Sequence, residues 1–229
     1  METQLVVDDK NNLVEMRPRG IQQPAPIRLI ATIISYIFHP IFIPVYLVVF
    51  LMKTNPYLFA DLSDIQKNRL LATFVILYVV FPVVSVLLMK ALGFINSIYL
   101  RTQRDRIIPY VVCMIYYWWV WYVMFNRAEL PRELAILSLA IFLASIGGLM
   151  ANINTKVSMH AMAAGVMAAF VIMLGFSQDI SFGIYISLAI LLAGLICTSR
   201  FIASDHIPRE IYGGLLIGIL SLIIAIKLG

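Results

Sequence analysis

The sequence predicts an all-α integral membrane protein, a bundle of about seven transmembrane helices. The chain of 229 residues is 62% hydrophobic and 13% charged, whereas soluble domains are about 45–50% apolar and about 25% charged. Its apolar residues gather in seven runs that contain no Lys, Arg, Asp or Glu. Two cysteines are too few for a disulfide scaffold, and a disordered chain would be polar and charged.

Each run is long enough, or nearly so, to cross a bilayer core of about 30 Å as a helix of about 20 residues. Helices satisfy their own backbone hydrogen bonds, which lipid cannot do. Residues 1–26 form a polar N-terminal tail that lacks the order of a signal peptide, and we interpret them as a loosely ordered arm before the transmembrane domain, 27–229. The predicted spans are Leu29–Leu51, Leu70–Met89, Ile107–Phe125, Leu134–Met150, Met162–Phe176, Phe182–Thr198 and Ile211–Ile226.

The first run carries His39, Pro40 and Pro44 near its middle. Proline removes a backbone hydrogen bond and kinks a helix, so this run is either one kinked span or two half-spans, and the total is six, seven or eight. We interpret His39 as a structural residue, with a lipid or proton role as the alternative. Glycines in later runs predict close contacts between helices, at Gly147, Gly148, Gly165, Gly213 and Gly214.

Three polar segments at the ends of apolar runs face the same water layer, because an even number of spans separates each from the next. They are 101–109, 152–160 and 199–210. With seven spans, 11 of the 17 basic residues lie on this side. The excess of Lys and Arg in cytoplasmic loops places it in the cytoplasm, and we predict a bacterial inner membrane.

The three segments hold two of the three histidines of the chain, His160 and His206. Arg and Lys side chains bind phosphate oxygens and stabilise transition-state charge. One histidine can attack phosphorus, and the other can protonate the leaving oxygen. Glu210 lies four residues after His206, a spacing that brings two side chains together on one helix face. Pro208 predicts that the last helix begins near 207–208, with its N–H groups directed at an anion.

These residues resemble the type 2 phosphatidic acid phosphatase superfamily of membrane phosphatases. The third motif of this family is Ser-Arg, followed after five residues by His and after three more by Asp. It corresponds here to Ser199-Arg200, His206 and Glu210, with Glu in place of Asp. The second, Pro-Ser-Gly-His, corresponds to 157–160, where Ser158 and His160 are kept. The first motif is a lysine, six residues and then Arg-Pro. Its arginine corresponds to Arg106, but the proline, Pro109, comes two residues late, and Tyr99 stands where the motif has its lysine.

The resemblance implies a six-helix phosphatase-like core, here with an extra helix, and a phosphohydrolase that needs no metal or other cofactor. It implies that His206 is the nucleophile, that His160 is the general acid and that Glu210 orients His206. The phosphate-binding residues would be Arg200, Ser158 and Arg106, with Lys156 in place of the missing lysine and Arg101 from the same basic run.

The implied substrate is a lipid phosphate or an isoprenoid pyrophosphate within the membrane, with no nucleic-acid partner. Enzymes of the resembled family usually work on the outer face of the membrane, whereas the distribution of basic residues places this site on the cytoplasmic face. Met159, in place of a glycine, and the missing lysine leave two alternatives open. One is an inactive lipid-phosphate-binding or transport protein on the same scaffold, and the other is a structural subunit of a membrane complex.

Overall fold

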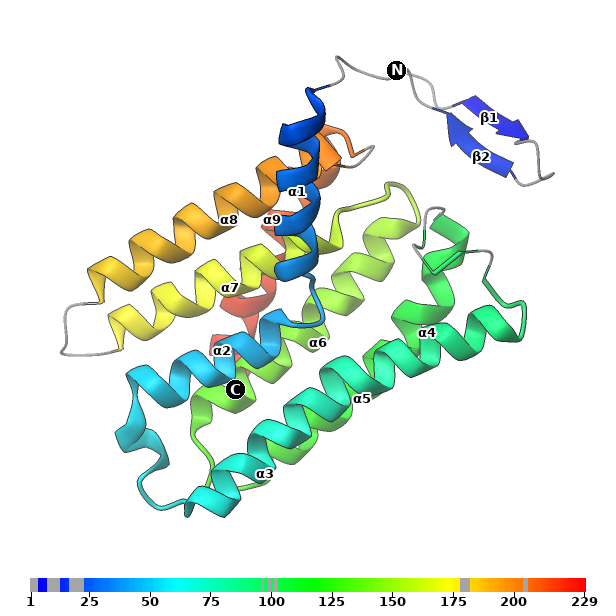
Figure 1. Cartoon of the computed structure of the whole chain (residues 1–229). Coiled ribbons are helices and arrows are strands. Elements are labelled where there is room, and N and C mark those ends of the chain that lie inside the picture. Colours follow the sequence, from blue (N-terminus) through cyan, green and yellow to red (C-terminus); the bar gives the residue numbers. More distant parts are fainter. Residues whose placement is uncertain are drawn as a thin grey trace.

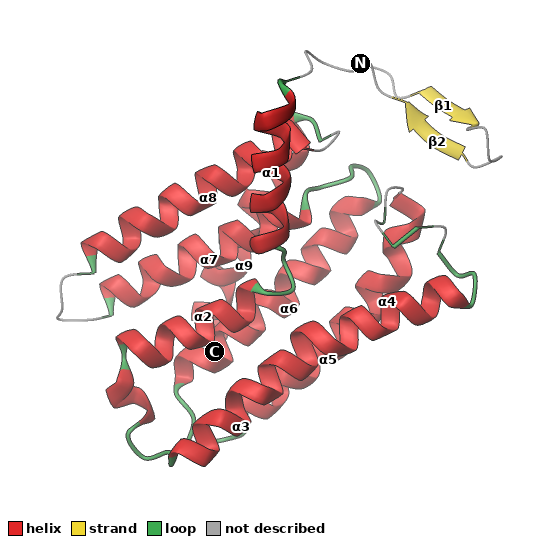
Figure 2. Ribbon diagram, in the orientation of Figure 1, coloured by secondary structure: helices red, strands yellow, loops and turns green. Residues whose placement is uncertain are grey.

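The computed structural model describes residues 4–7, 13–16, 23–95, 97–98, 100, 103–177, 182–203 and 206–229, and the fold is a bundle of α-helices (Figures 1 and 2). The principal helices are α1 (Ala25–Ile37), α2 (Ile43–Thr54), α3 (Asp64–Val75), α4 (Phe81–Ala91), α5 (Gln103–Phe125), α6 (Arg132–Asn152), α7 (Met159–Phe176), α8 (Gly183–Ala203) and α9 (Pro208–Leu228). A 3₁₀ turn, η1 (Pro56–Phe59), follows α2, and a π-helical turn, η2 (Ile76–Val80), joins α3 to α4.

Among the described residues, six helices are long and apolar enough to cross a membrane. The first is continuous through α3, η2 and α4, from Asp64 to Ala91, and the others are α5 to α9. These six correspond to the second through seventh predicted spans, which confirms an all-helical membrane bundle. Each helix extends past its predicted run into the polar flanks, so several candidate site residues lie in terminal helical turns.

The first predicted span is two short helices, which confirms the two-half-span alternative. Helix α1 ends at Ile37 and α2 begins at Ile43, with His39 and Pro40 in the corner between them. Helix α1 packs against α8, and α2 runs from this corner toward the start of α3 (Figure 1). The pair therefore still carries the chain from one end of the bundle to the other.

The centre of the bundle is formed by α6 and α7, where 56% of the most apolar stretch of each helix is buried. Helices α7 and α9 approach at glycines, as predicted for Gly165 and Gly214. A Cβ atom at Gly214 would lie 2.6 Å from the carbonyl oxygen of Ser158, whereas one at Gly213 would meet nothing nearer than 3.8 Å. The backbones of α7 and α9 thus lie in direct contact beside the candidate site, and Gly213 does not take part.

Two short strands, β1 (Gln4–Val7) and β2 (Leu13–Met16), pair antiparallel within the N-terminal tail, with Val6 opposite Val14. The sequence analysis interpreted this tail as a loosely ordered arm and did not predict the pairing. Valine is favoured in strands, and the segments were too short to stand out beside the apolar runs.

Candidate active site

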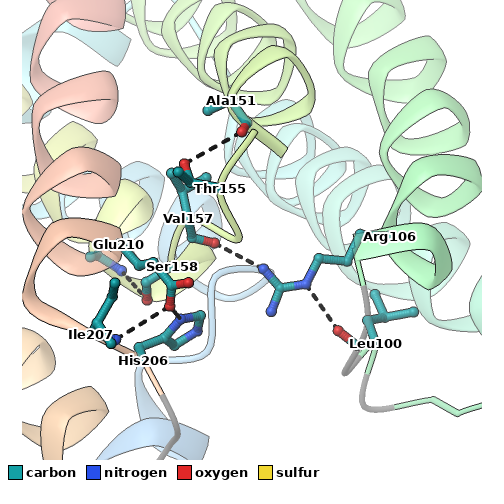
Figure 3. A network of polar contacts seen from close by, with 10 residues as sticks. Leu100, Arg106, Ala151, Thr155, Val157, Ser158, His206, Ile207 and Glu210 are labelled. Atoms are coloured by element: carbon teal, nitrogen blue, oxygen red, sulfur yellow. Dashed lines mark hydrogen bonds and ion pairs between the residues drawn. The ribbon is translucent and has the colours of Figure 1, made fainter. Parts of the chain in front are cut away.

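The site lies where three helix ends meet: the start of α5, the start of α7 and the connection from α8 to α9 (Figure 3). Arg106 of α5 donates from Nη1 to the carbonyl oxygen of Val157 at 2.9 Å. The backbone N–H of Ser158 donates to the carbonyl oxygen of Glu210 at 3.0 Å. These bonds join the three polar segments, which the sequence analysis placed on the same side of the membrane.

His206 and Glu210 form a tightly bonded pair. His206 Nδ1 lies 2.7 Å from Glu210 Oε2, and the two side chains are only 6% and 3% exposed. Helix α9 begins at Pro208, as the sequence predicted. Glu210 therefore stands in the first turn of the helix, and its side chain reaches back to His206, two residues before the helix begins. The same carboxylate oxygen accepts the N–H of Ile207 at 3.3 Å. The sequence analysis expected the N–H groups of this helix start to be directed at an anion, and the N–H of Ile207 is directed at the carboxylate of Glu210.

The pKa of His206 is lowered from its ordinary value of 6.5, chiefly because burial disfavours the imidazolium. The hydrogen bond and charge of Glu210 oppose this shift, while the charges of Arg106 and Arg200 add to it. His206 is therefore neutral at pH 7. A neutral imidazole that donates Nδ1–H to a carboxylate carries its lone pair on Nε2, the arrangement that a nucleophile requires.

Arg106 is a buried arginine, 6% exposed, at the start of α5 and not in the preceding loop. Its Nε donates to the carbonyl oxygen of Leu100 at 2.9 Å, in addition to the bond from Nη1 to Val157. The guanidinium thus holds the loop before α7 in place, and its charge reaches His206. Sequence reasoning placed Arg106 near the site and did not predict these backbone contacts.

Ser158 and His160 begin α7. Ser158 is fully buried and is the N-cap residue, its Oγ accepting the N–H of Ala161 at 3.4 Å. His160 lies in the first turn, and its Nε2 is 3.1 Å from the carbonyl oxygen of Ser35 in α1. The ring of His39 stands nearly perpendicular to that of His160, with 5.2 Å between their centroids.

Ser199 and Arg200 occupy the last turn of α8, whereas the sequence analysis placed them in the following loop. Ser199 Oγ donates to the carbonyl oxygen of Ile196 at 2.7 Å and lies 3.1 Å from Ser35 Oγ. The positive charge of Arg200 acts on all three histidines of the chain.

Two further residues, Arg101 and Lys156, were predicted to bind phosphate. Arg101 lies outside the described residues, and Lys156 is half-buried in the loop between α6 and α7, so their roles stay predictions. Among the described residues, no three His, Cys, Asp or Glu side chains are grouped closely enough to hold a metal ion.

Sequence reasoning did not predict that Ser35 and His39 lie beside His160. The available signal was a lone histidine in an apolar run, because ionisable residues at membrane depth are costly and usually functional.

Comparison with family models finds the PAP2 superfamily over residues 145–229. Neither the curated proteins nor the solved structures give a match. The matched segment runs from the second half of α6 to the end of the chain and includes His160, Arg200, His206 and Glu210. Arg106 and His39 reach the same site from helices outside that segment.

Proposed function

We propose that the chain is a member of the PAP2 superfamily, whose model matches its residues 145–229, and that it hydrolyses a lipid phosphate or an isoprenoid pyrophosphate through a phosphohistidine intermediate. The superfamily suggests phosphatase activity on lipid phosphates, and six apolar helices of spanning length suggest an integral membrane protein. The observation that carries the proposal is the His206–Glu210 pair, buried at the same helix ends as His160, Arg106 and Arg200.

In the first step, Nε2 of His206 attacks phosphorus, and the bond from phosphorus to the leaving oxygen breaks. Glu210 supports this attack because its carboxylate accepts Nδ1–H and stabilises the charge that develops on the ring. His160, in its protonated form, gives a proton to the leaving oxygen. The phosphoryl oxygens are bound by Arg200, Ser158 and Arg106, together with Lys156 and Arg101, which offsets the charge of the transition state.

In the second step, water attacks the phosphorus of phosphohistidine and the N–P bond breaks. His160, now neutral, takes the proton from the attacking water and is ready for the next cycle. The products are inorganic phosphate and either an alcohol or, from a pyrophosphate, the corresponding monophosphate. The starting state is restored without an oxidant, a reductant or a further group.

The position of the site supports a lipid substrate. The proposed residues lie in the terminal turns of apolar helices, so a phosphate bound among them sits at the boundary between membrane and water. A substrate there can keep its acyl or prenyl chain beside the lipid-facing helix surfaces. The apolar spans support an integral membrane protein, and a bacterial inner membrane stays a prediction.

The test is phosphate release by the purified protein in detergent with EDTA present. The substrates are phosphatidic acid, phosphatidylglycerol phosphate, undecaprenyl pyrophosphate and an aryl phosphate, with His206→Ala in parallel. We expect turnover that survives EDTA and falls by at least about 10³-fold in the variant, because the nucleophile is lost. Full activity in a folded His206→Ala variant contradicts the mechanism. Saturable lipid binding without turnover on any substrate supports the inactive-binder alternative.

A further inference from the structure

We infer that the corner between α1 and α2 is a wall of the active site, and that His39 is a positioning residue that holds the ring of His160 for proton transfer through Nδ1. The proton-transfer part of this inference rests on the proposed function. His39 and Ser35 belong to none of the three motifs and lie outside the segment that matches the family model.

The bond between α1 and His160 assigns the roles of the two ring nitrogens. The carbonyl oxygen of Ser35 can only accept a hydrogen bond, so His160 Nε2, at 3.1 Å, must carry a proton. Nε2 thus stays protonated and donates to the carbonyl oxygen of Ser35 whether the ring is neutral or charged. The proton that moves to and from the substrate must then be the one on Nδ1.

His39 restricts the rotation of this ring. Its own ring stands at 83° to that of His160, with 5.2 Å between the centroids, an edge-to-face contact. His39 also makes an edge-to-face contact with Phe42, with 6.2 Å between the ring centroids. A side chain without a ring at position 39 would leave space into which His160 could turn.

The corner is fixed to the rest of the site by its own hydrogen bonds. Ser35 Oγ lies 3.1 Å from Ser199 Oγ, the residue before Arg200. Tyr46 Oη donates to the carbonyl oxygen of Ile37 at 3.0 Å and ties α2 to the end of α1. Ser35 is buried, whereas Leu29, Ile30 and Ile33 of the same helix are exposed. Helix α1 therefore turns a polar position toward the site and its apolar side chains outward.

The first experiment needs no turnover and so is independent of the proposed function. ¹⁵N-histidine NMR of the full-length protein in detergent reports which ring nitrogen is protonated, and three histidines are few enough to assign with single variants. We expect the neutral ring of His160 to be protonated on Nε2 in the wild type and in His39→Phe, which keeps a ring. In His39→Ala we expect both tautomers. A proton on Nδ1 in the wild type, or an unchanged His160 in His39→Ala, overturns the inference.

The second experiment compares leaving groups. His39→Ala should lower kcat on phosphatidic acid about tenfold or more, because its alkoxide leaving group depends on the general acid. KM should change less than about threefold, and the aryl phosphate, whose leaving group needs little protonation, should be nearly unaffected. His39→Phe should restore most of the activity.

Tyr46→Phe is the matched control, since it loosens the same corner without touching His160. An equal loss on both substrates, shared by His39→Ala and Tyr46→Phe, means that the corner is merely structural and overturns the inference. Absence of phosphate release by the wild-type protein contradicts the proposed function instead, and the tautomer measurement then decides the position of His160.

Discussion

Glu210 sets the chemistry of His206 because the two side chains are buried against each other with 2.7 Å between Nδ1 and Oε2. The carboxylate has two effects. It fixes the tautomer that leaves the lone pair on Nε2, the atom that attacks in the proposed mechanism, and it raises the pKa of His206 against the opposing effects of burial and two arginines. These effects can be separated by changing the charge and the length of the side chain independently.

The acid limb of kcat/KM reports this pKa, because only neutral His206 can attack. In the wild type we expect the acid limb to lie below pH 6.5, since the pKa of His206 is lowered from that value. Glu210→Gln removes the group that raises the pKa, so the limb should move to still lower pH. It should also lower kcat by about 10²-fold or more through loss of ring orientation.

Glu210→Asp is the control for charge, since it keeps the carboxylate and shortens its reach by one methylene. Its acid limb should stay nearer that of the wild type while kcat falls. The measurement is a pH–rate profile of each variant on one substrate. An acid limb that moves to higher pH in Glu210→Gln would contradict the assignment of His206 as the titrating group.

At the scale of elements, the site depends on how closely α7 and α9 approach. The N–H of Ser158 on one side and the carbonyl of Glu210 on the other are joined at 3.0 Å, and Gly214 lies against the same stretch of α7. Separation of these two helices would move His160 away from the His206–Glu210 pair.

Two neighbouring glycines provide a test of this contact. Gly214→Ala places a Cβ atom against the Ser158 carbonyl oxygen, and backbone cannot yield as a flexible side chain does. We expect a loss of about 1–3 kcal/mol in stability from overpacking, together with reduced activity. Gly213→Ala meets only an ordinary contact and should be neutral or slightly stabilising, because alanine favours a helix over glycine. Thermal unfolding in detergent and phosphate release measure both, and equal effects would refute the close approach.

The parts of the site that were predicted from sequence depend on local spacing or on whether an even number of spans separates two segments, which places both on one side of the membrane. His206 and Glu210 lie four residues apart across a helix start, and Arg106 reaches Val157 because two spans separate their segments. Ser35 and His39 were missed because their contacts depend on α1 packing against α8, and a pattern of apolar runs does not specify which helices are neighbours. Helix ends were misplaced for a related reason: hydropathy marks where lipid ends, whereas Ser199 and Arg200 continue α8 into the polar layer.

At the scale of the whole molecule, the alternation of six spans fixes which connections share a side. Phe94 and Asn154 lie on connections separated by α5 and α6, whereas Ala128, between α5 and α6, and Ser177, after α7, lie at the opposite ends of the spans. The site is on the side of Phe94 and Asn154. Whether that side is cytoplasmic, as the basic residues predict, can be measured directly.

Single cysteines at these four exposed positions, in a chain with Cys113 and Cys197 replaced by alanine, can be labelled in intact cells with a membrane-impermeant maleimide. We expect positions 94 and 154 to behave alike, both labelled or both protected. Positions 128 and 177 should then be protected where 94 and 154 are labelled, and labelled where they are protected. Labelling after lysis is the control for accessibility. A different result at positions 94 and 154 would mean that α5 or α6 does not cross the membrane.

The hydrogen bond between Ser35 and Ser199 joins residues 164 positions apart, and this separation has a consequence for the timing of synthesis. At about 5–20 residues per second, roughly 8–33 seconds pass between the translation of the α1 corner and that of Ser199. His206 and Glu210 are translated later still. On the mechanism proposed above, a partly translated chain therefore carries the general acid and one wall of the site without the nucleophile. Such a chain would hydrolyse no membrane lipid until α9 begins to insert.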